Sequence, residues 1–177
     1  MELSGPLTDG RIAVRPAVPS DAPAFLGYKR RPESQAYVSR TVDTLEQART
    51  LITDCRAEPD SLLCAVELDG RVVGDIGGRR YRPESLGPEP TVWDFYLGYT
   101  VDPDCWNRGV ASAAVSLLVP ALHEAGLRRI VAKTFADNAA SIRVLTKNGF
   151  RLEATERAAV LGRDGRWLDD CTMAHLP

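Results

Sequence analysis

Residues 97–112 constrain the fold more than any other stretch of the chain, and they read Leu-Gly-Tyr-Thr-Val-Asp-Pro-Asp-Cys-Trp-Asn-Arg-Gly-Val-Ala-Ser. Their order predicts a strand, a tight loop and the start of a helix. Tyr99 and Val101 favour a strand, and Pro103 ends it, because proline has no N–H to donate to a sheet and restricts the residue before it. The small residues that follow Gly109 then favour a helix.

A loop that opens a helix has a particular affinity for anions. Its first N–H groups have no partner within the helix, and the helix dipole adds partial positive charge there, so such an end binds phosphate. Gly109 and Ala111 lack bulk, which lets a ligand approach the backbone closely. These residues alone leave two interpretations open, an anion-binding helix start and an ordinary strand-to-helix turn.

Length and composition favour one globular domain spanning residues 1–177, because 44% of the 177 residues are hydrophobic and 26% are charged. The net charge of −2 and the lack of a basic block argue against a nucleic-acid partner. No apolar run approaches a signal core or a membrane span, so we expect no membrane partner and a cytoplasmic location. The four cysteines are scattered and only two histidines could join them, so we expect no metal site.

The remaining pattern predicts seven strands and four helices in the order strand, two helices, three strands, helix, strand, helix, two strands. Asp69-Gly70 predicts a hairpin turn, Thr44 and Gln47 predict a capping box, and Pro120 predicts a kink within its helix. A long connection is expected over residues 79–90, either as part of a binding site or as a plain surface loop. The expected strands cover residues 11–15, 62–68, 72–76, 91–101, 127–134, 150–160 and 167–174, and the expected helices run from 22 to before 32, from 45 to about 55, from 107 to 124 and from 139 to 147.

A second motif identifies the chain more sharply. Asn138, Ser141 and the run Lys147-Asn148-Gly149-Phe150 resemble the Asn-x-x-Ser and Lys-x-Gly-Phe signature of the GNAT acyltransferases. The resemblance is to the form of this signature found in the RimJ/RimL branch of the family, which modifies the N-termini of ribosomal proteins. Residues 97–111 resemble the family's Leu-Gly-Tyr-x-x-x-Pro-x-x-Trp-x-x-Gly-x-Ala loop, which cradles the pyrophosphate of acetyl-coenzyme A. Trp106 stands where many relatives carry Gln or Arg, which favours the RimJ/RimL branch.

The resemblance covers nearly the whole chain and implies a fold. It extends to residues 11–15, 44–48 and 165–167, which look like the family's first strand, second helix and last hairpin. The implied fold is a single α/β GNAT-like domain. Its mixed, mostly antiparallel central sheet has about seven strands with about four helices, and strands four and five splay apart. Two motifs at the family's separation support the fold and the coenzyme, whereas they say little about the acceptor.

The same resemblance implies where acetyl-coenzyme A, the expected co-substrate, binds. The thioester would lie where residues 99–101 and 131–134 separate, with the freed strand edge bonding the pantetheine amides. A backbone N–H near Tyr99 would stabilise the negative charge that develops on the thioester oxygen. Arg108 would add charge toward a phosphate. The implied coenzyme-binding residues are Tyr99, Thr100, Val101, Trp106, Asn107, Arg108, Gly109, Val110, Ala111, Ser112, Asn138 and Ser141.

The leaving thiolate needs a proton donor, and Leu145 stands where many relatives have a tyrosine for that role. In the RimJ/RimL branch a serine at the position of Ser141 is the usual candidate. Ser141 follows Asn138 by one helical turn, so both face the same side of the helix. The alternative for Ser141 is a surface serine that bonds its own backbone.

The base that deprotonates the amine is less defined by the sequence. Tyr96 stands where the branch often has a glutamate, and Asp94 shares its strand face. Asp94 is therefore a candidate base acting through a water, with a solvated carboxylate or an arginine partner as the alternative. Glu153 and a chain of waters are further candidates. Cys105 invites an acetyl-cysteine route, but the family transfers the acetyl group directly.

The sequence thus predicts an acetyl-coenzyme A-dependent N-acetyltransferase acting by direct attack in a ternary complex. Its amine acceptor is a protein N-terminus, a polyamine, an antibiotic or an amino-acid derivative, and the enzyme is a monomer or a homodimer. Trp93, Phe95, Tyr96, Tyr37 and the long connection are candidates for the acceptor pocket, although alternation prevents all of them from lining it. The alternative is an acyl-coenzyme A-binding module without turnover. Another nucleotide-binding fold is disfavoured because its Gly-rich motifs are missing.

Overall fold

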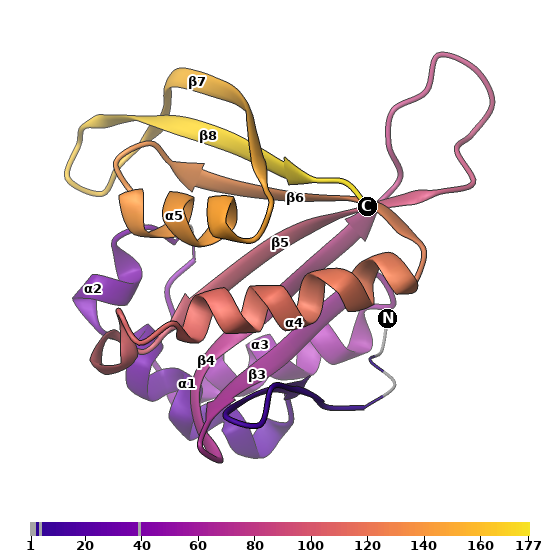
Figure 1. Ribbon diagram of the computed structural model, residues 1–177. Helices are drawn as coiled ribbons and strands as arrows, with labels where there is room; N and C mark the ends of the chain where they lie inside the picture. The colour runs from indigo at the N-terminus through magenta and orange to yellow at the C-terminus, as the bar shows by residue number, and fades with distance from the viewer. Residues whose placement is uncertain (1–2, 4, 39) are drawn as a thin grey trace.

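The computed structural model describes residues 3, 5–38 and 40–177, which form one sheet with helices on both sides (Figure 1). The described residues form eight strands in the order β1-β2-β3-β4-β5-β6-β8-β7, and five α-helices. The strands are β1 (Leu7–Thr8), β2 (Ile12–Pro16), β3 (Ser61–Leu68), β4 (Arg71–Tyr81), β5 (Trp93–Val101), β6 (Leu127–Phe135), β7 (Arg151–Leu161) and β8 (Trp167–His175). The helices are α1 (Ala22–Lys29), α2 (Pro32–Gln35), α3 (Leu45–Ala57), α4 (Val110–Glu124) and α5 (Ala139–Lys147).

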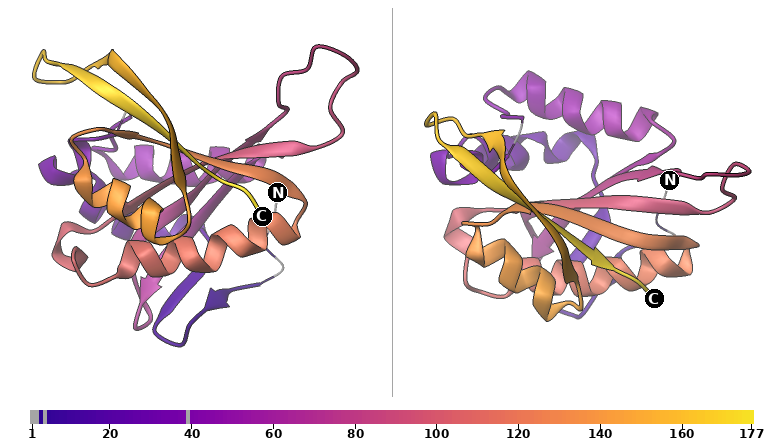
Figure 2. Two further views of the ribbon diagram at one scale, coloured as in Figure 1. Left: turned by 45° about the horizontal axis from the view of Figure 1, so that its top comes forward. Right: turned by 90° about the horizontal axis from the view of Figure 1, so that it is seen from above.

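The sheet separates two groups of helices. α1 and α3 lie on one side of it, whereas α4 and α5 lie on the other (Figure 2). Two buried clusters follow this division. Phe25 and Ile52 belong to the cluster under α1 and α3, and Phe95 and Leu118 belong to the larger cluster under α4. The predicted α/β class with a mixed, mostly antiparallel sheet is confirmed.

The structure adds one strand and one helix to the seven strands and four helices predicted. β1 forms because Asp9 accepts the N–H groups of Arg11 and Ile12, at 2.9 and 2.6 Å, and turns the chain back onto β2. Two residues are too few to show alternation. α2 begins at Pro32, between the first two predicted helices, because proline is preorganised for the first position of a helix.

Local signals predicted two elements well. Asp69 and Gly70 both have positive φ, at 50° and 78°, and join β3 to β4 in the predicted antiparallel hairpin. Thr44 caps α3 by accepting the N–H of Gln47 at 3.2 Å, and the Gln47 side chain accepts the N–H of Thr44 at 3.1 Å. The predicted capping box is therefore confirmed.

The connection between β4 and β5 begins later than predicted. β4 continues to Tyr81, which pairs with Asp94 on β5, so only residues 82–92 form the loop that stands out from the body of the molecule (Figure 2). Side-chain contacts extend the strand, because Tyr81 stacks on Tyr96 with ring centroids 4.3 Å apart. The sequence of residues 79–82, Arg-Arg-Tyr-Arg, suggests a loop and does not reveal this contact between neighbouring strands.

Helix α4 begins at Val110, three residues after the predicted start. Asn107 and Gly109 have φ of 58° and 78°, and these left-handed conformations cannot continue a helix. The helix runs through Pro120 without a break and ends before Gly126, whose φ is 86°. β5, α4 and β6 form the predicted strand-helix-strand unit, and β5 and β6 are parallel.

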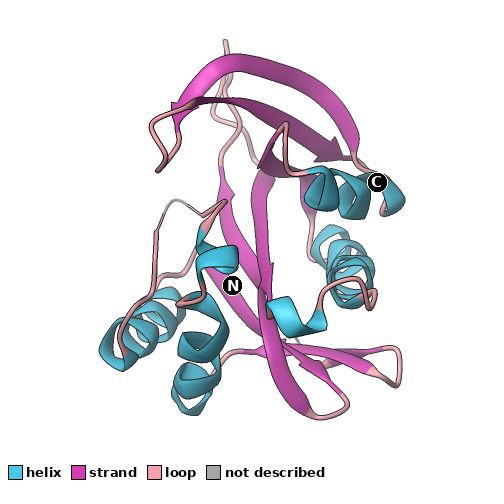
Figure 3. Cartoon of the chain, turned by 90° about the vertical axis from the view of Figure 1, so that its left-hand side faces the viewer, coloured by secondary structure: helices cyan, strands magenta, loops and turns pink. Residues whose placement is uncertain are grey.

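The last hairpin extends the sheet beyond β6. β8 lies between β6 and β7, and both of its pairings are antiparallel. The hairpin arches over the segment that follows α2 (Figure 3). Arg163 in its turn donates to the Val38 carbonyl at 2.9 Å and to the Gln35 carbonyl at 3.4 Å. The end of the chain therefore contacts one of its first helices.

Candidate active site

The sheet opens between its two parallel strands. The described pairs of β5 and β6 run from Trp93 and Leu127 to Tyr96 and Val131 and stop there. β5 continues to Val101 along β4, while β6 continues to Phe135 along β8. The two strands therefore diverge, as the family resemblance implies, and the edge of β5 after Tyr96 faces the opening.

Tyr99 and Ser141 meet at this opening. The Tyr99 hydroxyl lies 2.8 Å from Ser141 Oγ, where either oxygen can donate, and it donates to the Ser141 carbonyl at 3.3 Å. Burial raises the pKa of Tyr99, and the hydrogen bond from Ser141 offsets part of the rise. Tyr99 therefore keeps its proton near neutral pH and can pass it toward Ser141. The sequence pointed to each residue but not to their contact.

Asn138 fixes the helix that carries Ser141. Its Oδ1 accepts the N–H of Ser141 at 3.1 Å and so caps α5. Asn138, and not the neighbouring Asp137, is therefore the N-cap of α5. Because Oδ1 is used in the cap, Nδ2 is the side-chain atom with which Asn138 could donate to a ligand.

The loop before α4 presents backbone donors in the predicted place. The first hydrogen bond that leads into the helix joins the Ala113 N–H to the Gly109 carbonyl at 2.9 Å. The N–H groups of Val110, Ala111 and Ser112 therefore precede the helical ladder. A Cβ at Gly109 would meet nothing within 4 Å, so the space in front of the loop is open. Asn107 and Arg108 are exposed beside it.

Two side chains hold this loop in position. Trp106 Nε1 donates to the Val101 carbonyl at 2.8 Å and ties the loop to the end of β5. Asn148 Nδ2 donates to Ser112 Oγ at 3.2 Å and to the Val144 carbonyl at 2.8 Å, which joins α4 to α5. Trp106 and Ser112 thus support the loop through contacts that the motif alone did not reveal.

Asp94 does not join this group. It lies near the start of β5, is 1% exposed, and accepts two hydrogen bonds from Arg128, at 3.1 and 2.7 Å. Tyr99 lies five residues further along the strand, which is about 17 Å. The structure therefore favours the arginine-partner alternative over the role of base. Glu153 is likewise paired, with Arg129.

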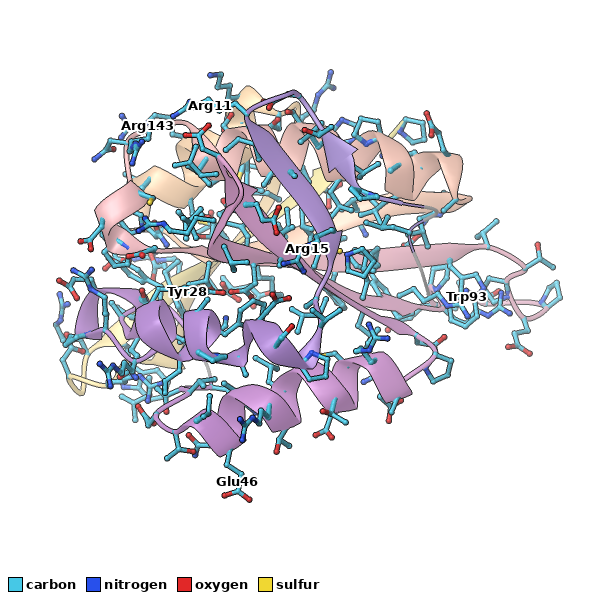
Figure 4. All side chains as sticks on the ribbon, turned by 90° about the horizontal axis from the view of Figure 1, so that it is seen from below. Arg11, Arg15, Tyr28, Glu46, Trp93 and Arg143 are labelled. Carbon is cyan, nitrogen blue, oxygen red and sulfur yellow. The ribbon has the colours of Figure 1, made fainter. Side chains whose placement is uncertain are left out.

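Trp93 and Phe95, on the paired part of β5, do not line the opening. Trp93 sits under Arg80 and Arg82 at the base of the 82–92 loop (Figure 4), and Phe95 is buried in the core. Of the residues expected around the acceptor, Tyr37 lies nearer, because its ring contacts Phe135 at the end of β6. The expectation that Trp93 and the long connection wall the acceptor pocket is therefore not supported.

The opposite side of the opening holds a polar network that sequence reasoning missed. Lys29 Nζ lies 2.7 Å from Asp75 Oδ1, which also accepts the Tyr28 hydroxyl at 2.8 Å. Lys29 also donates to Thr100 Oγ1 at 3.4 Å, so the Thr100 side chain points away from the α5 side. Tyr28 lies between α1 and the sheet (Figure 4). Asp75 is the one charged residue in the expected strand at residues 72–76, and this could have pointed to the network.

Comparison with known proteins identifies the family. The sequence matches the model of the acetyltransferase (GNAT) domain over residues 11–151. The chain belongs to the GNAT acetyltransferase family. The GNAT chain is 29% identical over 158 residues to the uncharacterized N-acetyltransferase YoaA of Bacillus subtilis strain 168, which is 85% of each chain. It is 36% identical over 115 residues to the L-amino acid N-acetyltransferase AaaT of Escherichia coli strain K12, covering 62% of this chain and 64% of that protein.

Solved structures share the fold of the GNAT chain. Mycobacterium smegmatis RimJ, in complex with CoA-disulfide, superposes with a TM-score of 0.80 over 97% of this chain and 86% of that chain. The two sequences are 23% identical, so the likeness concerns the fold.

No helix in the described residues is long and apolar enough to cross a membrane. Those residues contain no group of three or more His, Cys, Asp or Glu side chains placed to hold a metal ion.

Proposed function

We propose that this GNAT chain is an acetyl-coenzyme A-dependent N-acetyltransferase that acetylates a primary amine by direct attack in a ternary complex. The observation that carries the proposal is the hydrogen-bonded pair of Tyr99 and Ser141 at the opening between β5 and β6. Next to it, α4 begins with three N–H groups outside its helical ladder. One side of the sheet thus offers both a proton donor and an anion-binding helix start.

The start of α4 fits a pyrophosphate. The N–H groups of Val110, Ala111 and Ser112 are donors, and the dipole of a 15-residue helix adds positive charge. Arg108 is exposed beside them and can complement the phosphate charge. The open space at Gly109 leaves room for close approach to the backbone. Asn138 Nδ2 would donate to the pantetheine arm.

Acetyl-coenzyme A supplies an activated acetyl group. The amine nitrogen forms a bond with the thioester carbonyl carbon, and the carbon–sulfur bond breaks. A backbone N–H near Tyr99 on the free edge of β5 would donate to the carbonyl oxygen as negative charge develops there. The Ser141 hydroxyl would give its proton to the leaving sulfur and take one from Tyr99 through the 2.8 Å hydrogen bond, and solvent would return a proton to Tyr99.

The described carboxylates near β5 give no clear base. Asp94 is paired with Arg128 and Glu153 with Arg129, so we assign the proton lost by the amine to solvent. Cys105 is 1% exposed, and Arg71 lies 3.7 Å from its sulfur. Burial keeps this thiol from a coenzyme and from an amine, which favours direct transfer over an acetyl-cysteine. Positioning supplies much of the rate in such a reaction.

The test is to incubate the protein with acetyl-coenzyme A and a panel of primary amines while measuring free thiol. The panel includes peptides with free N-termini, polyamines, aminoglycoside-like antibiotics and amino acids. We expect thiol release that depends on both an amine and the protein. Titration calorimetry with coenzyme A and with ATP accompanies the assay. Tight coenzyme binding without thiol release would favour the acyl-coenzyme A-binding module, and binding of ATP alone would contradict both.

A further inference from the structure

A small cavity on the α1 side of the sheet adjoins the opening. Its lining residues come from α1, α2, the segment after α2 and β5, and they are Lys29, Ser34, Val38, Arg40, Val42 and Thr100. Thr100 belongs to the part of β5 that has separated from β6. The cavity has a volume of about 20 Å³, which is room for roughly one or two water-sized groups. It therefore suits a small polar head and not a whole molecule.

The charge of this lining is positive. Lys29 and Arg40 contribute two cations, Ser34 and Thr100 contribute hydroxyls, and the described lining has no carboxylate. Asp75 lies behind Lys29 and balances its charge at 2.7 Å. No described residue forms an ion pair with Arg40. Arg40 is exposed, so its charge is hydrated and free to pair with an anion that enters the cavity.

Ser34 is a second, independent sign of a missing occupant. Ser34 is only 7% exposed. Its Oγ has no hydrogen-bond partner among the described residues. Buried hydroxyl groups are normally satisfied, and an unsatisfied one costs about 1–3 kcal/mol. Ser34 lies on α2, and Val38 and Arg40, which line the same cavity, belong to the segment that follows α2. Arg163 holds that segment from the β7–β8 turn, as described above.

From these contacts we infer that the acceptor is an amino-acid-like amine whose carboxylate binds between Arg40, Lys29 and the Ser34 hydroxyl. This inference rests on the acetyltransferase function proposed above and specifies its substrate class. An α-amino acid carries its amine one carbon from its carboxylate, so an anchored carboxylate places the amine beside Thr100 at the opening. The nearby cations also favour the neutral, nucleophilic form of the amine. A polyamine, with several positive charges, is repelled by the same lining.

The kinetic test compares L-amino acids with their carboxamides as acceptors. Arg40→Ala is expected to raise the KM of the acids about 10- to 100-fold, the usual range for losing a hydrogen bond to a charged group, and to change the KM of the amides by less than about twofold. Arg40→Lys restores part of the difference. Arg49→Ala is the control, because Arg49 is an exposed arginine on α3 outside the cavity. Amides and polyamines acetylated as well as the acids, with Arg40→Ala without effect, would overturn the inference.

Ser34→Ala separates recognition from folding. Removing an unsatisfied buried hydroxyl does not lower stability, so the melting temperature is expected to stay the same or rise. The KM of the acids is nevertheless expected to increase, while that of the amides does not change. An unchanged KM for the acids would contradict the role of Ser34.

A binding measurement keeps this inference distinct from the proposed function. N-acetyl-L-amino acids and their carboxamides are titrated calorimetrically into protein saturated with coenzyme A. Selective binding of the acids that is lost in Arg40→Ala supports the anion site, even if no amine is turned over and the proposed function fails. Equal binding of both compounds, or binding of neither, in a protein that does acetylate amines overturns the anion site and leaves the proposed function standing.

Discussion

Tyr99 on β5 and Ser141 on α5 are joined by a 2.8 Å hydrogen bond across the place where the sheet opens. The two residues are 42 positions apart, and each is fixed by its own element. Asn138 caps the helix of Ser141, and β4 pairs with the strand of Tyr99. A serine hydroxyl alone is a weak acid at neutral pH. A tyrosine that keeps its own proton makes the pair a short relay.

This relay predicts the effect of two substitutions. Ser141→Ala is expected to lower kcat about 10- to 100-fold, because the leaving thiolate loses its proton donor. Tyr99→Phe is expected to lower kcat by a smaller factor, because Ser141 keeps its hydroxyl. Coenzyme A affinity, measured by calorimetry, should change little in either variant. A fully active Ser141→Ala enzyme would remove the role of acid from this residue.

The loop before α4 gives a second prediction, about Gly109. Gly109→Leu places a side chain in front of the N–H groups of the helix and also strains a backbone with φ of 78°. We expect coenzyme A affinity to fall at least about tenfold, which is ~1.4 kcal/mol. Gly70→Leu is the matched control, because Gly70 has the same φ and open surroundings in the β3–β4 turn. It should lose stability similarly but bind coenzyme A normally, and a Gly109→Leu variant that also binds normally would refute the phosphate cradle.

Substitution of Asp94 distinguishes a structural role of this carboxylate, as the partner of Arg128, from a catalytic role as the base. Asp94→Asn removes a carboxylate that is 1% exposed from its pair with Arg128, and we expect the free energy of unfolding to fall by about 1–3 kcal/mol. The pH profile of kcat should not change. Asp164→Asn is the control, since Asp164 and Arg166 form an exposed pair whose loss should change stability little. Loss of the acidic limb of the profile, or a shift in it, would return Asp94 to the role of base, because a base must lose its proton before it can act.

The capping box gives a prediction about stability alone. Thr44→Ala removes the acceptor for the Gln47 N–H, and we expect the free energy of unfolding to fall by about 1 kcal/mol in urea titrations. Thr53→Ala on the same helix is the control, because the Thr53 hydroxyl only bonds the Arg49 carbonyl of its own helix. Equal effects of the two substitutions would show that the cap contributes nothing of its own.

A pair of histidines predicts a pH dependence of stability. Burial, and then the nearby His123, lower the pKa of His175, and the two rings share a 2.9 Å hydrogen bond. Below about pH 6.5 the unfolded chain therefore binds more protons at this residue than the folded chain does, so stability falls as the pH falls. Urea unfolding at about pH 7.5 and about pH 5.5 should show a smaller loss of stability in His175→Phe than in the unsubstituted protein. An identical loss in both would exclude this source.

Local sequence signals determined much of the fold. The hairpin at Asp69-Gly70, the cap at Thr44 and the termination of α4 at Gly126 each depend on backbone preferences of a few adjacent residues. The two motifs also predicted the opening between β5 and β6 and the helix start beside it, through resemblance to a family. Their spacing along the chain is a property of the sequence, so both could be recognised before any contact was known.

Only the tertiary structure decided which side chains meet. The bond between Tyr99 and Ser141, the pairing of Asp94 with Arg128, and the cavity around Arg40 each join residues that are distant in sequence or lie on separate elements. Sequence spacing does not encode such contacts, because the packing of helices on a twisted sheet sets them. Asp94, a candidate base in the sequence, is therefore the buried partner of a half-exposed Arg128, and the Ser34 hydroxyl has no hydrogen-bond partner among the described residues.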